Sequence, residues 1–159
     1  MATGSSRRPS ALRGPVYVDA SALVKLYVPE RESDALNRTL QGRRDLLVSD
    51  LAVTEVVSSL ARRRREGVIE TEAVVRLYRA LLAHLEDRVF RRIELVPGTH
   101  REAEKLLLSI EAVRLRSADA LHLALAMADK AGTVVTYDGR LGKAALAVGL
   151  QVHPSAVAE

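Results

Sequence analysis

The chain has 159 residues and no cysteine, which excludes disulfide bonds and thiolate metal ligands. Hydrophobic residues make up 48% of it, yet no apolar run approaches the ~20 residues that a membrane helix needs, so we expect no membrane contact. The formal charge of +4 does not by itself indicate a nucleic-acid-binding surface. Arg7, Arg8 and Arg13 lie within the first fourteen residues, and the other 21 basic residues are balanced by 20 acids.

Residues 1–14 differ in composition from the rest of the chain. This segment, MATGSSRRPSALRG, is small, polar and aperiodic, and it lacks the apolar core of a secretory signal. We predict a disordered tail at 1–14, with an RNA-contacting arm or a vector-derived remnant as alternatives, and a single domain at 15–159. The absence of cysteine and of a signal is compatible with the reducing cytoplasm, where we expect the protein to act.

Within the domain, short runs of β-branched and aliphatic residues alternate with longer amphipathic segments. Strands are predicted at 16–18, 45–50, 93–96, 133–136 and 150–153. Helices are predicted after Asp19 and at 33–40, 51–66, 71–89, 99–110, 117–131 and 141–148. Ser49, Thr99 and Ser117 are in positions to cap the helices that follow them. This alternation predicts an α/β fold in which helices cover both faces of a parallel sheet.

Two aspartates follow buried strands and precede helices in the same way. Asp19 ends the strand in VYVDASALV, and Asp138 follows the strand in VVTYDGRL. Open α/β sheets place their ligands at the carboxyl ends of the strands, so we expect both acids at one site. Turn formation is the alternative role for each of them.

Two more acids occupy helix starts near the same predicted edge. Glu55 lies about one turn into its helix among valines, an unusual setting for a solvated acid, although an ion pair with the nearby arginines is an alternative. Asp119 lies in the first turn of its helix, where an acid also simply stabilises the helix dipole. If the four acids are close together, each disfavours ionisation of the others, and at least one pKa should be raised.

Four short motifs, taken in order, resemble the PIN domain, and specifically the VapC-type toxins of toxin–antitoxin pairs. They are VDAS with Asp19 and Ser21, TEV with Glu55, SADALHLA around Asp119, and TYDGRL with Thr136 and Asp138. The resemblance runs from about residue 16 to the end of the chain. It implies a three-layer α/β/α sandwich around a central parallel sheet, here of about five strands.

The resemblance also implies a metal-dependent endoribonuclease in which Asp19, Glu55, Asp119 and Asp138 are the catalytic metal ligands. Carboxylate oxygens, with no cysteine available, suit Mg²⁺ or Mn²⁺. Ser21 and Thr136 would orient ligands or waters, although ordinary turn chemistry explains Ser21 equally well.

The implied partners are an RNA substrate, an antitoxin whose tail fills the acidic groove, and a second copy of the chain in a homodimer. Arg116, Arg62 and Arg65 are candidates for RNA contact, but helix-end charge also explains them. His122, one turn after Asp119, could be drawn into the site, and a packed histidine is the interpretation we favour.

Two other functions are considered for the same acids. One is an inactive PIN scaffold that only binds RNA or protein. The other is a phosphotransfer receiver-like domain, which needs a lysine at the end of its last strand before a helix. This chain has no lysine at any predicted strand end, since Lys143 falls in a helix.

Overall fold

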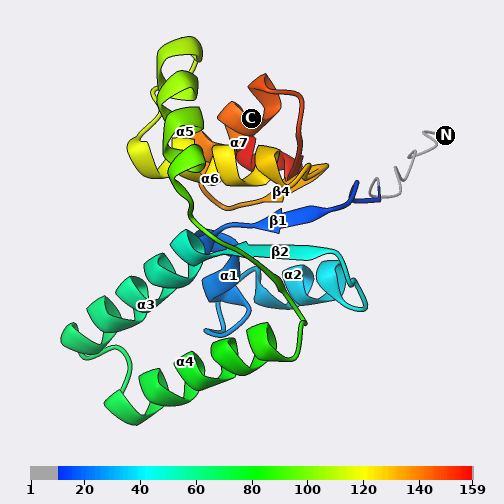
Figure 1. Ribbon diagram of the computed structural model, residues 1–159. Helices are drawn as coiled ribbons and strands as arrows, with labels where there is room; N and C mark the ends of the chain where they lie inside the picture. The colour runs from blue at the N-terminus through cyan, green and yellow to red at the C-terminus, as the bar shows by residue number, and fades with distance from the viewer. Residues whose placement is uncertain (1–10, 159) are drawn as a thin grey trace, which may run out of the picture.

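The computed structural model describes residues 11–158 and contains a five-stranded parallel sheet (Figure 1). The order across the sheet is β3-β2-β1-β4-β5, and every neighbouring pair is parallel. The strands are β1 (Val16–Val18), β2 (Leu46–Ser49), β3 (Arg91–Ile93), β4 (Thr133–Val135) and β5 (Gln151–His153). The predicted α/β class with a five-stranded parallel sheet is therefore confirmed.

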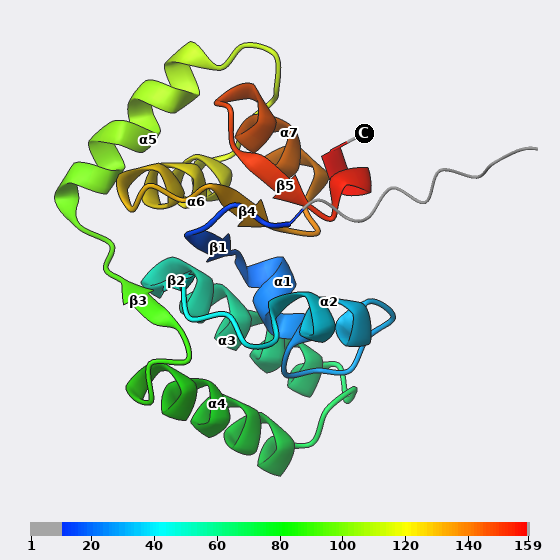
Figure 2. The same ribbon diagram turned by 90° about the vertical axis from the view of Figure 1, so that its right-hand side faces the viewer.

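Helices cover both faces of this sheet, as the two ribbon views show (Figures 1 and 2). On one face lie α1 (Ala20–Lys25), α2 (Ser33–Leu40), α3 (Asp50–Arg65) and α4 (Thr71–Glu86). On the other lie α5 (Pro97–Ser109), α6 (Ser117–Ala128) and α7 (Gly139–Ala147), and the short 3₁₀ helix η1 (Ser155–Ala158) follows β5. This is the predicted three-layer sandwich.

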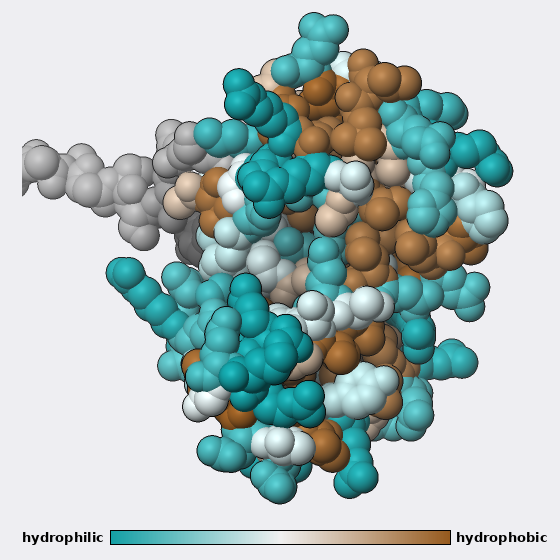
Figure 3. All heavy atoms as spheres, turned by 90° about the vertical axis from the view of Figure 1, so that its left-hand side faces the viewer, coloured by the Kyte–Doolittle hydropathy of each residue, from teal (hydrophilic) through white to brown (hydrophobic). Residues whose placement is uncertain are grey.

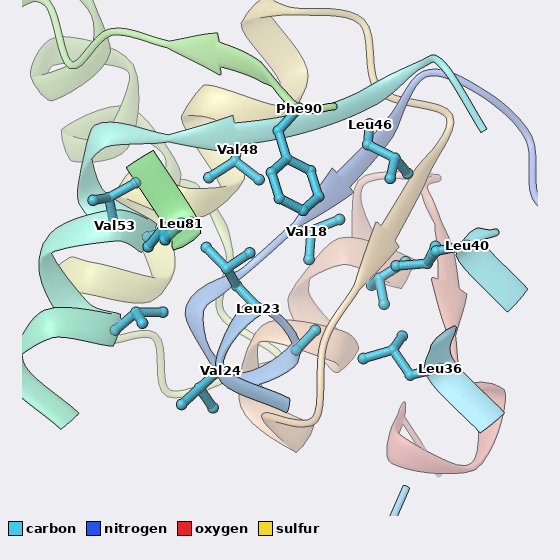
Figure 4. Packing of buried hydrophobic residues seen from close by; sticks show 14 of the residues in the cluster. Val18, Leu23, Val24, Leu36, Leu40, Leu46, Val48, Val53, Leu81 and Phe90 are labelled. Carbon is cyan, nitrogen blue, oxygen red and sulfur yellow. The ribbon is translucent and has the colours of Figure 1, made fainter. Parts of the chain in front are cut away.

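Each face of the sheet has its own hydrophobic core, and β1 contributes to both. Val16 and Val18 pack on the side of α1 to α4, whereas Tyr17 between them packs on the side of α6, as the alternation of a strand requires. All three residues are fully buried. In the first core, side chains such as Val18, Leu23 and Phe90 point toward one another from β1, α1 and the segment before β3 (Figure 4).

The central place of β1 determines which parts of the chain meet at the carboxyl edge of the sheet. Val16 is paired with Leu46 of β2 on one side and with Thr133 of β4 on the other. The residues that follow these strands therefore emerge side by side, although they are far apart in sequence. This edge lies on the left in Figure 1.

The third strand is earlier in the chain than predicted. We expected 93–96 because those residues are apolar, but the strand is Arg91–Ile93 and only Ile93 of it is buried. β3 is an edge strand, where charged side chains are tolerated because one side faces solvent. Arg91 and Arg92 form ion pairs with Asp129 and Asp50 at 2.7 and 2.5 Å.

Two of the predicted helix caps are also wrong. Helix α5 begins at Pro97, which suits the first helical position because its missing N–H has no partner to lose there, and Thr99 is buried inside the helix. Helix α6 begins at Ser117, but its N-cap is Arg116. The Ser49 cap is confirmed, since its hydroxyl accepts a hydrogen bond from Ala52 N.

Of the tail predicted at 1–14, residues 1–10 lie outside the described part of the chain. Residues 11–14 are described, and they contact the sheet: Arg13 N donates to Gln151 Oε1 at 2.8 Å, and its carbonyl accepts from Thr133 Oγ1 at 2.6 Å. Over residues 11–158, no helix is both long and apolar enough to cross a bilayer.

Candidate active site

Asp19 lies at the centre of the carboxyl edge, where it caps the short helix α1. Its Oδ1 accepts hydrogen bonds from Ala22 N at 2.9 Å and Ser21 Oγ at 2.8 Å. Its Oδ2 accepts from Thr136 Oγ1 at 2.7 Å and from the same serine hydroxyl at 3.0 Å. The residue is 97% buried, so these bonds replace the water that solvates an exposed carboxylate.

Thr136 connects Asp19 to Asp138. Its hydroxyl accepts from Asp138 N at 2.9 Å while it donates to Asp19. Asp138 caps α7, and its Oδ1 accepts from the backbone N–H groups of Arg140 and Leu141 at 2.8 and 3.2 Å. The capping preference of aspartate after a buried strand thus places both acids at the same edge.

Asp119 is the third residue of α6, and its carboxylate reaches back to the start of the helix. Oδ2 accepts from Arg116 N at 2.9 Å and lies 3.4 Å from Arg140 Nη1. The residue is buried, with one hydrogen bond that stabilises the helix start and one contact to a cation. Asp119 therefore stabilises the start of its helix, and it also lines the cleft described below.

Glu55 approaches from α3 and is held by a side chain. Its Oε2 lies 2.7 Å from Nε2 of His122, a buried residue of α6. The other ring nitrogen, Nδ1, lies 2.7 Å from the hydroxyl of Tyr17 in β1. His122 is packed, as we favoured from sequence, but it is also in direct contact with one of the four acids.

Glu55, Asp119 and Asp138, called here the outer acids because they lie around the central Asp19, share one property. Each uses a single carboxylate oxygen for the contacts above, and the other oxygen has no hydrogen-bond or ion-pair partner among residues 11–158. These oxygens are Glu55 Oε1, Asp119 Oδ1 and Asp138 Oδ2. Three carboxylate oxygens are therefore available to a ligand, next to the fully hydrogen-bonded Asp19.

All four acids line one cleft of about 440 Å³. Ser21, His122 and Arg62 are also part of its wall. A larger hollow of about 560 Å³ lies elsewhere, lined among others by Tyr27, His84 and Phe90, and none of the four acids lines it. All four candidate metal ligands thus lie at the smaller cleft.

The three arginines proposed for RNA contact are placed differently. Arg62 lines the acidic cleft, and with Arg65 it lines an adjoining hollow of about 310 Å³ that also includes Glu55. Arg116 lines neither, and its contact with the site is made by its backbone N–H.

Figure 3 shows the face of the molecule toward which the carboxyl ends of the strands point, with a hydrophilic area at lower left and hydrophobic areas above and to the right.

The pKa of Asp19 is raised above the ordinary aspartate value, chiefly because burial disfavours the charged form. The hydrogen bonds from Thr136, Ala22 and Ser21 act in the opposite direction, as would a positive charge on His122. A raised pKa was expected from repulsion between the four acids, so the direction is as predicted but the main cause is burial. Burial likewise raises the pKa of Tyr17, which keeps its hydroxyl hydrogen.

The donor set suits a hard divalent cation by its chemistry, because all four candidate ligands are carboxylates. In the described part of the chain, however, no three carboxylate or imidazole side chains are arranged so that they could hold a metal ion as they stand. The three partnerless oxygens belong to side chains that line the cleft. Mg²⁺ or Mn²⁺ therefore fits the residues present by the chemistry of their donor atoms.

The fold and the site together define a parallel α/β/α sandwich with four carboxylates at the carboxyl edge of its sheet. The model of the PIN domain family matches residues 16–146. Ribonuclease VapC46 of Mycobacterium tuberculosis is 38% identical over 140 residues, which are 86% of this chain and 95% of the relative. Ribonuclease VapC45 of the same species is 35% identical over 144 residues, 88% and 95% of the two chains.

Solved structures agree on the fold. Mycobacterium tuberculosis VapC20, a toxin that cleaves the sarcin-ricin loop, superimposes with a TM-score of 0.66 at 18% identity, covering 85% of this chain and 95% of that one. PAE2754 of Pyrobaculum aerophilum gives 0.64 at 21% identity, covering 90% and 86%. The chain belongs to the PIN domain family, in its VapC-type branch.

Proposed function

We propose that this protein is a metal-dependent endoribonuclease and the toxin of a type II toxin–antitoxin pair. The observation that carries the proposal is the single cleft lined by Asp19, Glu55, Asp119 and Asp138, which come from four separate segments of the chain. The names of the relatives, all ribonucleases, point to RNA as the substrate. An inactive scaffold is the less favoured function, because none of the four acids is missing.

The four acids would hold Mg²⁺ or Mn²⁺ in the cleft. When bound, such an ion supplies an activated water and neutralises charge that develops on a phosphodiester. Ser21 and Thr136 support this site by holding Asp19, because both hydroxyls donate to its carboxylate. Arg62 and Arg65 would contact the backbone of the RNA beside the cleft, where they share a hollow with Glu55.

Two protein partners belong to the proposal. One is a cognate antitoxin, whose tail would occupy the acidic cleft and so exclude RNA. The other is a second copy of the chain, because helices α4 and α5 carry exposed apolar side chains, including Val75, Tyr78 and Leu108. Sizing with light scattering at micromolar concentration tests the homodimer, and a monomer under those conditions would contradict it.

The central experiment is RNA cleavage by the purified chain. Single-stranded RNA should be cut with Mg²⁺ or Mn²⁺, left intact with EDTA, and left intact by Asp19→Asn and Asp138→Asn. The matched control is Asp34→Asn, the same change at an exposed first-turn acid of α2, which should cleave like the parent. Absence of metal-dependent cleavage by the folded parent would favour the inactive scaffold.

A further inference from the structure

The outer acids of the cleft are anchored in two different ways. Asp119 and Asp138 are each held by backbone N–H groups at the start of a helix. Glu55 lies inside α3, where the backbone N–H groups are used by the helix itself, and its only partner in the described chain is Nε2 of His122. We propose that His122 is a positioning residue that holds Glu55 ready for the divalent cation, an inference that rests on the function proposed above.

Glu55 needs such a partner more than the two aspartates do. Glutamate has a longer side chain with more rotamers, and the Glu55 side chain is 36% exposed. Without a fixed contact its carboxylate would sample positions both inside and outside the cleft. His122 restricts it from the side, because it contacts only Oε2 and leaves Oε1 without a partner among the described residues.

His122 is itself fixed by a chain of buried hydroxyl groups. Its Nδ1 lies 2.7 Å from the hydroxyl of Tyr17, which lies 2.8 Å from Ser49 Oγ. Ser49 in turn accepts a hydrogen bond from Ala52 N at 3.1 Å, as the N-cap of α3. Tyr17 and Ser49 are fully buried, and 4% of His122 is exposed. The imidazole is thus positioned from β1 and from the end of β2.

The hydrogens of this chain can be assigned without placing an additional charge in the core. Ser49 accepts from Ala52, and Tyr17 is its only partner for donation among the described residues, so its hydrogen points to the Tyr17 oxygen. The hydroxyl of Tyr17 then donates to His122 Nδ1. This leaves the ring hydrogen on Nε2, which donates to Glu55.

Two amide substitutions distinguish the role of Nε2 of His122 from that of Nδ1. His122→Gln places an amide nitrogen near the position of Nε2 and can still donate to Glu55. His122→Asn places its nitrogen near Nδ1 and is too short to reach Glu55. We expect His122→Asn to lower the affinity for Mn²⁺, titrated by electron paramagnetic resonance, about 10- to 100-fold, whereas His122→Gln stays close to the parent.

The chain supplies a matched control in a second tyrosine–histidine pair. Tyr27 OH lies 2.7 Å from His84 Nδ1, at the larger hollow that contains none of the four acids. His84→Asn removes the same kind of ring from the same kind of contact, and it should leave the affinity for Mn²⁺ unchanged. Thermal melts of all variants show which of them are folded under the titration conditions.

The outcomes distinguish this inference from the proposed function. If the parent does not bind Mn²⁺, or if Glu55→Gln binds it as well as the parent does, the metal site itself is wrong. If the parent and Glu55→Gln behave as expected but folded His122→Asn retains full affinity, or folded His122→Gln loses as much as His122→Asn, the positioning role is wrong.

One further measurement does not depend on any variant folding. The ¹⁵N resonances of the imidazole in the metal-free parent report which ring nitrogen carries the hydrogen. The hydrogen-bond chain predicts protonation at Nε2. Finding the hydrogen at Nδ1 instead would overturn the inference, because His122 could not then donate to Glu55.

Discussion

Thr136 donates a hydrogen bond of 2.7 Å to Asp19, across 117 positions of sequence. The same hydroxyl accepts from the backbone of Asp138, so one side chain connects two of the four acids. Thr136 is fully buried, so water cannot replace its hydroxyl as the hydrogen-bond partner of Asp19 and Asp138 unless the structure opens. This residue ties the end of β1 to the end of β4.

Thr136→Val keeps the shape of the side chain and removes the hydroxyl. We expect a loss of about 1–3 kcal/mol in the free energy of unfolding, because Asp138 N and Asp19 each lose a buried partner. RNA cleavage should fall as well, since Asp19 loses one of its three hydrogen-bond donors and is held only by Ser21 and Ala22 N. Urea denaturation and cleavage assays measure the two effects, and Thr136→Ser, which retains the hydroxyl, is the control. Equal losses in both variants would show that the hydroxyl contributes no more than the methyl group.

The raised pKa of Asp19 makes a prediction about pH. A folded state with a raised pKa binds the proton more tightly than the unfolded state, whose value is near 3.8. The metal-free parent therefore loses the contribution of this group as the pH rises from about 3.8 through the folded pKa. Asparagine does not titrate, so Asp19→Asn should gain stability relative to the parent over the same window.

Thermal melts of both proteins in EDTA, from pH 4 to pH 8, test this prediction. The melting temperature of Asp19→Asn should equal or exceed that of the parent at neutral pH, and its advantage should shrink toward pH 4. The amide can be accommodated, because Thr136 and Ser21 hydroxyls are able to accept as well as donate. An advantage that instead grows toward pH 4 would mean that the fold stabilises the charged carboxylate.

Arg140 places a cation beside the candidate metal site, 3.4 Å from Asp119 Oδ2. A positive charge there disfavours a second cation, so Arg140→Gln should raise the affinity for Mn²⁺ modestly, by about 1.5- to 5-fold for a partly exposed pair. Arg91→Gln is the control, because Arg91 pairs with Asp129. Both affinities can be measured by isothermal titration calorimetry. A lower affinity in Arg140→Gln would indicate that Arg140 holds Asp119 in the geometry that the metal needs.

Arg62 and Arg65 make a prediction about salt. If each contacts one phosphate of single-stranded RNA, Arg62→Gln and Arg65→Gln should each reduce the slope of log K against log salt by about 0.7. Arg64→Gln changes the charge equally on the same exposed helix end but does not line the hollow beside Glu55, so its slope should match the parent. Fluorescence anisotropy in EDTA measures binding without cleavage. If the slopes of the three variants are identical, the arginines affect RNA binding only through their overall charge, and Arg62 and Arg65 make no special phosphate contact.

The sequence predicted the parts of the site that depend on local rules. Asp19 and Asp138 follow buried strands and cap helices, and both features are visible in a short window of sequence. Glu55 was recognisable from the valines around it, and the structure supplies the reason: its neighbours Val53 and Val56 pack in the core. The sheet and its layers followed from the alternation of strands and helices.

The parts that sequence reasoning missed depend on contacts between distant segments or on exposure at an edge. The link from Tyr17 to His122 spans 105 positions, and the link from His122 to Glu55 spans 67, so no periodicity indicates them. The one available signal was that His122 and Asp119 are three residues apart on one helix. β3 was misplaced because an edge strand with two arginines has no hydrophobic pattern.

The central position of the first strand has a consequence for the order of events during synthesis. β1 is made first, but its neighbour β4 is made more than a hundred residues later, because Val16 pairs with Thr133. A growing chain that ends before β4 has three of the acids but neither Thr136 nor Asp138. Contacts of such long range also form late in folding. The site is therefore completed only when synthesis of the chain is nearly finished. Incomplete chains should not cleave RNA, and C-terminal truncations of increasing length made in a cell-free system would test this.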